Sequence, residues 1–164
     1  MESFVEKICP ETKKLLKVFQ EILSSIPNSM CCIVGGWVRD TMTGNKIPRD
    51  IDMIMYFDDV NYFIEQLEKK LIVYKKVRHQ LRKFISEVHV NMISLLNYDV
   101  DIREINGEKI ELLTLIENDL RSRDFTVNSI YFDVIKQEII DPLGGIKDLN
   151  KGVLRCTTNT NITF

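Results

Sequence analysis

Two short segments contain residue types that suit phosphate and metal chemistry. In "CIVGGWVRD" an apolar run breaks at Gly35 and Gly36, and Arg39 follows three residues later. In "RDIDMIMYF" Asp50 and Asp52 stand at the start of another apolar run. Glycines let a backbone approach a phosphate closely, and carboxylates hold Mg²⁺. Together the segments predict a site where a metal ion and phosphate groups meet.

The spacing of these residues supports the same chemistry. Alternate residues of a strand point to one face, so Asp50 and Asp52 converge on the same side. Paired metal ions at such a site activate an attacking hydroxyl and stabilise a leaving pyrophosphate. Gly35 and Gly36 lie at the start of the next expected helix, where free amides favour anions. Arg39, one turn inside that helix, reaches a phosphate with its planar guanidinium.

Other interpretations compete with each segment. A glycine pair after a strand is more often a tight turn than a phosphate cradle, and aspartates beside an arginine are more often a solvated loop. The D-x-D pattern also occurs in glycosyltransferases and in haloacid-dehalogenase phosphatases, but the latter usually carry a threonine where this chain has Ile54. A P-loop is excluded because no Gly-Lys-Ser or Gly-Lys-Thr follows the glycines.

The elements that must position these residues follow from hydrophobic periodicity and turn signals. The central strand is "IDMIMYF", because it is apolar on both faces. Three later strands are expected to be antiparallel, with a turn at Asn106-Gly107. The expected order is helix 10–26, strand 30–34, helix 37–44, strand 51–57, helix 58–71, strands 71–77, 84–96 and 98–105, a helix and then a strand within 114–132, and a strand, turn, short helix and strand within 138–156.

Composition limits the remaining possibilities. The 164 residues, 45% hydrophobic and 28% charged, suit one globular domain. The net charge of -2 argues against a free-standing basic nucleic-acid binder. Four cysteines without a C-x-x-C pair indicate neither a zinc site nor a disulfide framework. No apolar run reaches the roughly 20 residues that span a bilayer. We expect a cytoplasmic protein without membrane contact, with the nucleus or an organelle as alternatives.

Three segments, taken in order, resemble a known family. They are "VGGWVRD…RDIDMIMYF", "LIENDLRSRDFTVNSIYF" and "IIDPLGGIKDLNKGVLR". This order resembles the class II tRNA nucleotidyltransferases, or CCA-adding enzymes, and the bacterial poly(A) polymerases, a branch of the polymerase β superfamily. The resemblance runs from about Ile33 to Arg155. It implies an α/β (α+β) fold, in which helices flank a mixed, mostly antiparallel sheet.

The resemblance assigns roles to the first two segments. It implies that Asp50 and Asp52 bind the catalytic Mg²⁺ ions. It also implies that Gly36 and Arg39 contact the incoming nucleoside triphosphate, while Gly35 completes the turn.

Downstream residues receive roles in the same way. Arg123 matches an arginine that holds the nucleotide, and Asp124 and Asn128 match residues that contact the ribose or brace the site. For Asp124 a simple helix cap is an equal alternative. A third carboxylate is expected on a neighbouring strand, and we favour Asp101 there, although alternation places Asp99 on the same face.

The function implied is a template-independent RNA nucleotidyltransferase head that adds CMP and AMP from CTP and ATP to the 3′ end of tRNA and releases pyrophosphate. A poly(A) polymerase and a non-catalytic module that only binds nucleotides or partners are the alternatives. We expect an N-terminal helix in residues 1–28, the catalytic head in 29–155, and the start of a neck region in 156–164. Neck, body and tail domains would then act in cis or in trans.

The chain departs from the family pattern at several points. Ser122 replaces the first of two arginines, which removes a cation near the phosphates. Trp37 replaces a small residue, so its indole either packs beneath the glycine turn or crowds the nucleotide. "KFISEVHV" stands where a Gly-Thr is usual, and the sequence contains no E-D-x-x-R segment of the type that selects CTP and ATP.

Overall fold

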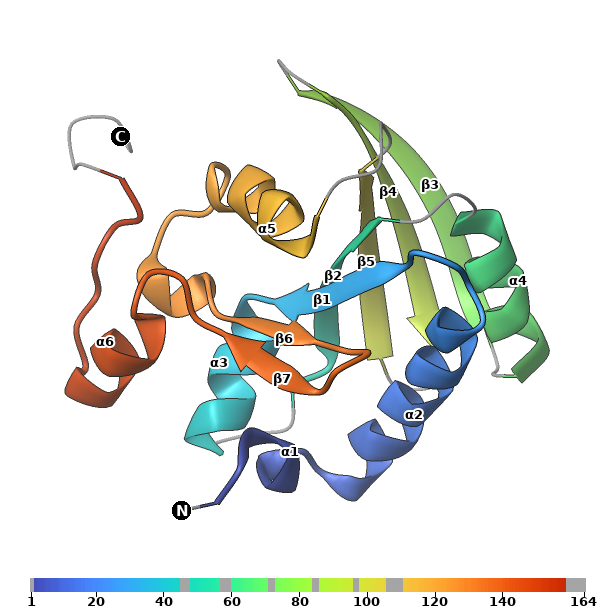
Figure 1. Ribbon diagram of the computed structural model, residues 1–164. Coiled ribbons are helices and arrows are strands. Elements are labelled where there is room, and N and C mark those ends of the chain that lie inside the picture. The colour runs from blue at the N-terminus through green and yellow to red at the C-terminus, as the bar shows by residue number, and fades with distance from the viewer. Residues whose placement is uncertain are drawn as a thin grey trace.

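The fold is built around one mixed sheet, described by a computed structural model (Figure 1). The structure describes residues 2–44, 48–56, 60–70, 73–83, 86–95, 98–105 and 111–158. Within these ranges seven strands pair in the order β3-β4-β5-β2-β1-β6-β7. The strands are β1 (Met30–Val34), β2 (Asp50–Tyr56), β3 (Val73–Lys83), β4 (Ser86–Leu95), β5 (Tyr98–Ile105), β6 (Tyr131–Asp133) and β7 (Glu138–Ile140). The predicted α+β class is confirmed.

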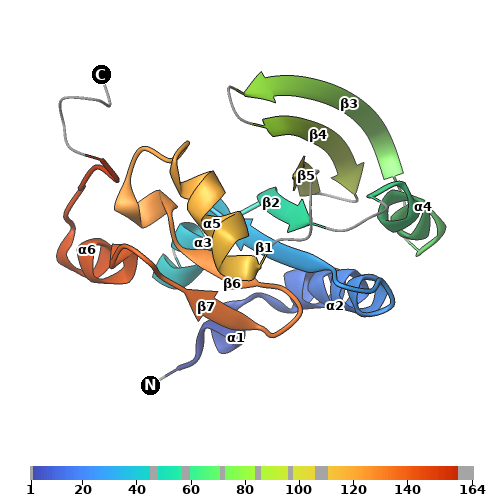
Figure 2. The same cartoon turned by 45° about the horizontal axis from the view of Figure 1, so that its top comes forward.

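Helices cover both faces of this sheet. In Figure 1 α5 lies above the part of the sheet formed by β1 and β2, and α2 lies beneath it. Turning the molecule shows the same two layers, with α4 beside α2 (Figure 2). The helices are α1 (Phe4–Lys7), α2 (Pro10–Ser24), α3 (Gly36–Thr43), α4 (Val60–Lys70), α5 (Leu112–Leu120) and α6 (Gly145–Lys151), with a 3₁₀ turn, η1, at Thr126–Asn128. None of the described helices is both long and apolar enough to cross a bilayer.

Strand directions match the expectation in most places. β3 pairs antiparallel with β4, and β4 pairs antiparallel with β5, as the sequence predicts. β2 is the middle strand and pairs antiparallel with β1 but parallel with β5. The parallel pair requires a long connection, and α4 with the β3–β4 hairpin supplies it.

Two expectations differ from the structure, and one lies outside it. The last strand expected within 138–156 does not form; Phe125 and Cys156 make an isolated bridge there. β3 continues to Lys83, beyond the expected end at 77, because it pairs with β4 along this length. The turn expected at Asn106-Gly107 lies outside the described residues.

Successive side chains of β2 lie on opposite faces of the sheet. Ile51, Met53 and Met55 are buried among the side chains of α2 and α4. Ile54 and Tyr56 are buried on the opposite face, against α5. Because alternate residues share a face, Asp50 and Asp52 belong to the α5 face, at the point where the strand begins.

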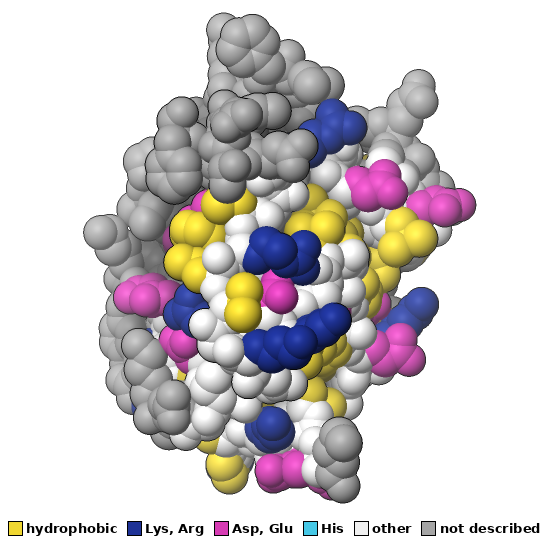
Figure 3. Space-filling view, turned by 90° about the vertical axis from the view of Figure 1, so that its left-hand side faces the viewer, with side chains coloured by type: hydrophobic (Ala, Val, Ile, Leu, Met, Phe, Trp, Pro, Cys, Tyr) yellow, Lys and Arg dark blue, Asp and Glu magenta, His cyan; other side chains and the backbone are white. Residues whose placement is uncertain are grey.

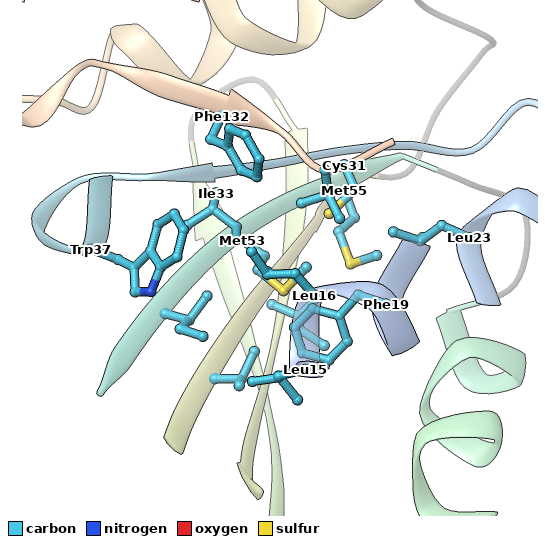
Figure 4. Close-up of a cluster of buried hydrophobic side chains, with 14 of the residues drawn as sticks. Leu15, Leu16, Phe19, Leu23, Cys31, Ile33, Trp37, Met53, Met55 and Phe132 are labelled. Carbon is cyan, nitrogen blue, oxygen red and sulfur yellow. The ribbon is translucent and has the colours of Figure 1, made fainter. Parts of the chain in front are cut away.

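The core beneath the sheet fixes the position of the glycine turn. Trp37, on the first turn of α3, is only 2% exposed and lies with its ring centroid 5.8 Å from that of Phe4 and 6.0 Å from that of Phe132. Figure 4 shows its indole directed into the core that Phe19 and Met53 also fill. Trp37 therefore packs beneath the turn, the first of its two expected placements.

The first residues of the chain contribute to this same core. α2 begins with Pro10 at its first position, where proline is tolerated, as the sequence predicts. Its buried face comprises Leu15, Leu16, Phe19, Ile22 and Leu23, and several of these side chains meet Cys31 and Met55 of the sheet in Figure 4. The helix at the N-terminus is thus packed against the sheet.

Candidate active site

The connection from β1 to α3 is shaped by its two glycines. β1 ends at Val34, and Gly35 caps the next helix with φ 86° and ψ −139°, a conformation that side chains other than hydrogen rarely allow. The amide of Arg39 donates to the carbonyl of Gly35 at 3.2 Å, which closes the first turn of α3. Helix α3 therefore begins directly at the glycine pair, and the free amides of a first helical turn suit an anion.

The space above each glycine is occupied by an arginine tip. A Cβ at Gly35 would lie 3.6 Å from both Nη1 of Arg123 and Oδ2 of Asp52. A Cβ at Gly36 would lie 3.5 Å from Nη2 of Arg39. Two guanidinium tips and one carboxylate thus meet over the bare backbone of the turn. This is the arrangement expected for binding a phosphate beside a cation.

Arg39 is held by two partners that leave part of its guanidinium over the turn. Its Nε donates to Oδ1 of Asp40 at 2.9 Å, and its Nη1 donates to Oδ1 of Asn128 at 2.7 Å. The side chain is 34% exposed. Because Nε and Nη1 are engaged, Nη2 is the group that remains over Gly36.

Arg123 is held in a similar way by one buried carboxylate. Its Nε and Nη2 donate to the two oxygens of Asp119 at 2.8 Å and 3.2 Å. Burial alone lowers the pKa of the Arg123 guanidinium, but the hydrogen bonds and charge of Asp119 outweigh burial and raise that pKa above its ordinary value. Arg123 therefore stays charged, and its Nη1 is left facing Gly35 and Asp52.

The acidic side of the site is a ladder of four aspartates across the parallel strands. Asp50 pairs with Asp99, and Asp52 pairs with Asp101, so all four side chains leave the sheet on the α5 face. Burial, and then the charge of Asp52, raises the pKa of Asp101. Asp99 is exposed, whereas Asp101 is half-buried beside Asp52.

Two adjoining hollows of about 520 Å³ and 340 Å³ run over these groups. Both are lined by Gly36, Arg39 and Asp52; the larger extends over Asp50, and the smaller reaches Arg123. Figure 3 views this end of the molecule, where Lys and Arg side chains gather around acidic ones. Eight of the nine residues predicted for the site line one hollow or the other: Gly35, Gly36, Arg39, Asp50, Asp52, Arg123, Asp124 and Asn128.

Comparison with protein families shows which family the chain belongs to. Residues 31–155 match the model of the poly A polymerase head domain. The chain belongs to this family. The match begins within β1, and it includes the glycine turn, the aspartate ladder and η1.

Curated relatives of the head domain carry two kinds of name. A protein from Ligilactobacillus salivarius named CCA-adding enzyme is 30% identical over 163 residues, which cover 98% of this chain and 38% of the relative. Poly(A) polymerase I of Escherichia coli O157:H7 is 32% identical over 150 residues, which cover 80% of this chain and 30% of the relative. The chain thus spans about a third of the length of these relatives.

Solved structures resemble the head domain along nearly its whole length. A CCA-adding enzyme in complex with CTP has a TM-score of 0.76 and 29% identity, covering 94% of this chain and 36% of that one. The Thermotoga maritima CCA-adding enzyme in complex with tRNA has a TM-score of 0.71 and 28% identity, covering 94% of this chain and 35% of that one. The polymerase-type head fold predicted from the motifs is therefore confirmed.

Asp101 and Asp124 are the two predicted carboxylates whose positions differ from those of Asp50 and Asp52. Asp101 lies in register with Asp52 but lines neither hollow. Asp124 lines the smaller hollow, and its Oδ1 accepts from the amide of Phe125 at 2.8 Å and lies 3.5 Å from Nδ2 of Asn128. Asp124 therefore braces the turn before η1, while Phe125, without a side-chain hydrogen bond, occupies the cap position.

The head domain also contains site residues that the motif analysis missed. Arg103 lines the smaller hollow and its Nη1 lies 3.8 Å from Oδ1 of Asp119. Arg49 lines the larger hollow, and its guanidinium carbon lies 4.8 Å from the ring centroid of Tyr98. Arg103 could have been found by alternation, because it follows Asp101 by two residues on one strand. The Asp119–Arg123 pair could have been found from its helical i,i+4 spacing.

The carboxylates offered by this domain suit a hard cation. Mg²⁺ takes oxygen ligands, usually one or two carboxylates with substrate phosphates and water, and Asp50 and Asp52 present such oxygens at the edge of the larger hollow. Among the described residues no three His, Cys, Asp or Glu side chains already form a closed metal cluster. The donor set therefore fits an ion shared with a phosphate ligand.

Proposed function

We propose that this head domain is the catalytic part of a template-independent RNA nucleotidyltransferase that adds CMP and AMP to the 3′ end of tRNA. One observation carries the proposal: the tips of Arg39 and Arg123 and the carboxylate of Asp52 meet over the Gly35–Gly36 turn. A triphosphate fits there, because its negative charge is met by the two guanidinium groups and its bulk by the bare backbone. Solved structures of CCA-adding enzymes in complex with CTP, with tRNA and with ATP favour these molecules as substrates.

Different residues of this chain have different roles in the proposed reaction. Asp50 and Asp52 would hold Mg²⁺, which supplies charge neutralisation at the reacting phosphate and the leaving pyrophosphate. Arg39 and Arg123 bind and orient the triphosphate, so that its α-phosphate is presented to the 3′-hydroxyl of the RNA. Asp101, in register with Asp52, is the proposed third carboxylate of the site.

The rest of the site is assigned supporting roles. Gly35 and Gly36 admit the phosphates to the backbone. Asn128 holds Arg39, and Asp124 braces the loop that contains Asn128. We propose that further domains, supplied in cis or in trans, select the nucleotide and hold the RNA, since the chain spans only about a third of its relatives. Four free thiols suit a reducing compartment, and we propose the cytoplasm.

A poly(A) polymerase is the second candidate, favoured by the relative that is 32% identical and named Poly(A) polymerase I. The two candidates share this head chemistry and differ in what is added. A non-catalytic module is disfavoured by the aspartate ladder, because mutually repelling carboxylates destabilise a fold that does not use them.

The experiment uses the purified chain with Mg²⁺, labelled CTP or ATP, and tRNA lacking its 3′ CCA. It is run alone and with a body segment of a CCA-adding enzyme added in trans. Addition of CCA supports the tRNA enzyme, and long A tracts support the poly(A) polymerase. Absence of any addition, together with binding of Mg²⁺–triphosphate, would support the non-catalytic module and contradict the proposal.

A further inference from the structure

The carboxylate of Asp119 is the most heavily used acidic group near the site, although it does not face either hollow. Its side chain is 4% exposed at the end of α5. Oδ2 accepts from Nε of Arg123 at 2.8 Å and from the hydroxyl of Tyr131 at 2.9 Å, and Oδ1 lies 3.8 Å from Nη1 of Arg103. Burial, followed by the charge of Asp119, raises the pKa of Tyr131 and keeps its hydroxyl a donor. Both carboxylate oxygens are thus committed.

The geometry of Arg123 shows what this commitment achieves. Asp119 accepts hydrogen bonds from Nε and Nη2 of Arg123. This bidentate pair fixes the plane of the guanidinium. Nη1 is left beside the place that a Cβ of Gly35 would occupy, and Oδ2 of Asp52 lies at the same distance from that place. Arg123 is therefore close to Asp52 but is bound elsewhere.

Without the charge of Asp119, Arg123 would pair with Asp52 in its place. A buried guanidinium that loses one carboxylate partner pairs with another carboxylate nearby. The charge of Asp52 already helps to raise the pKa of Arg123. An ion pair between Arg123 and Asp52 would then occupy the oxygen that a divalent cation needs. The two uses of Asp52 exclude each other, because one carboxylate oxygen cannot serve both cations fully.

We propose that Asp119 is a positioning residue that keeps Arg123 off Asp52 and so leaves Asp52 available to a divalent cation. The inference rests on the proposed function, since it assumes that Asp52 is a metal ligand. It gives the buried acid a role in the chemistry of the site that is separate from packing.

The test is a Mn²⁺ titration of the full chain followed by electron paramagnetic resonance, which reports free Mn²⁺ without any turnover. We expect Asp119→Asn to weaken Mn²⁺ binding about fivefold, because a partly exposed ion pair of Arg123 with Asp52 must first be broken. The double variant Asp119→Asn/Arg123→Gln should return to wild-type affinity. Asp133→Asn, which changes another buried acid whose Oδ1 accepts from the backbone amides of Ile135 and Lys136, should leave the affinity unchanged.

Each outcome has one meaning. If Asp119→Asn binds Mn²⁺ as tightly as wild type, or if the double variant binds no better than Asp119→Asn, the inference is wrong while the proposed function stands. If wild type binds no Mn²⁺ either alone or with a saturating non-hydrolysable CTP analogue, the proposed function fails and the inference fails with it. Should Asp119→Asn not fold by circular dichroism, Asp119→Ser replaces it: serine also removes the carboxylate that holds Arg123, and unchanged Mn²⁺ affinity would again overturn the inference.

Discussion

Replacing Gly35 by alanine tests whether the turn over the strand end is built for a ligand. Gly35 has φ 86° and ψ −139°, and holding an alanine in such a sparsely populated conformation costs about 1–3 kcal/mol. For a domain of this size each kcal/mol lowers the melting temperature by about 2–4 °C, so a fall of about 2–12 °C is expected. The new Cβ would also lie 3.6 Å from Nη1 of Arg123 and from Oδ2 of Asp52, so it would fill the gap between them.

Two other glycines provide matched controls. Gly44 has φ 69° and an added Cβ would meet nothing within 4 Å, so Gly44→Ala should cost about 1–2 kcal/mol of stability from strain alone and should leave nucleotide binding intact. Gly36 has no positive φ, and its Cβ would meet only the flexible tip of Arg39 at 3.5 Å. Gly36→Ala should therefore change stability by less than about 0.5 kcal/mol.

The assay combines thermal unfolding, followed by circular dichroism, with equilibrium binding of Mg²⁺–CTP. We expect Gly35→Ala to lose both stability and binding, and Gly44→Ala to lose stability only. The reasoning is refuted if Gly35→Ala melts at the same temperature as Gly36→Ala, or if it binds CTP as well as Gly44→Ala does.

Three further predictions concern the residues that support the site. Gly145→Ala should destabilise the fold by about 1–3 kcal/mol, measured as a lower urea midpoint, because its Cβ would overlap the carbonyl oxygen of Thr126; an unchanged midpoint would contradict this. The hydroxyl of Thr126 lowers the pKa of Asp148 below 3.8, so the stability lost in Asp148→Asn should be fully visible above about pH 4 and should vanish as the pH falls through the lowered pKa; a difference that persists in stronger acid would refute the assignment. Asn128→Ala, which frees Nη1 of Arg39, should weaken triphosphate binding about tenfold, and equal affinities in a titration would show that Asn128 does not hold the arginine.

The local parts of the site could be predicted from the sequence. The glycine turn, the helix that follows it and the central strand with Asp50 and Asp52 on one face all depend on residues close together in the chain. Alternation and helix-start signals are sufficient for such features. For the same reason a helix over 10–26 is predicted from hydrophobic periodicity, and α2 forms within that range.

The long-range parts could not be predicted in this way. The parallel pairing of β2 with β5 places Asp52 opposite Asp101, but alternation within one strand carries no information about register between strands. The last strand expected within 138–156 is absent, because the contact there is an isolated bridge between Phe125 and Cys156 and no ladder extends from it. The role of Asp119 depends on the meeting of α5 with Tyr131 and Arg103, which lie on different strands.

The most direct test of the central claim is nucleotide addition by Asp52→Asn. The purified variant is given Mg²⁺, labelled CTP and tRNA lacking CCA, under the conditions in which wild type adds nucleotides, and its fold is checked by circular dichroism. The account predicts a folded protein in which addition falls by at least about a thousandfold, since an essential charge at the reacting phosphate is lost. Addition at the wild-type rate by folded Asp52→Asn would contradict it.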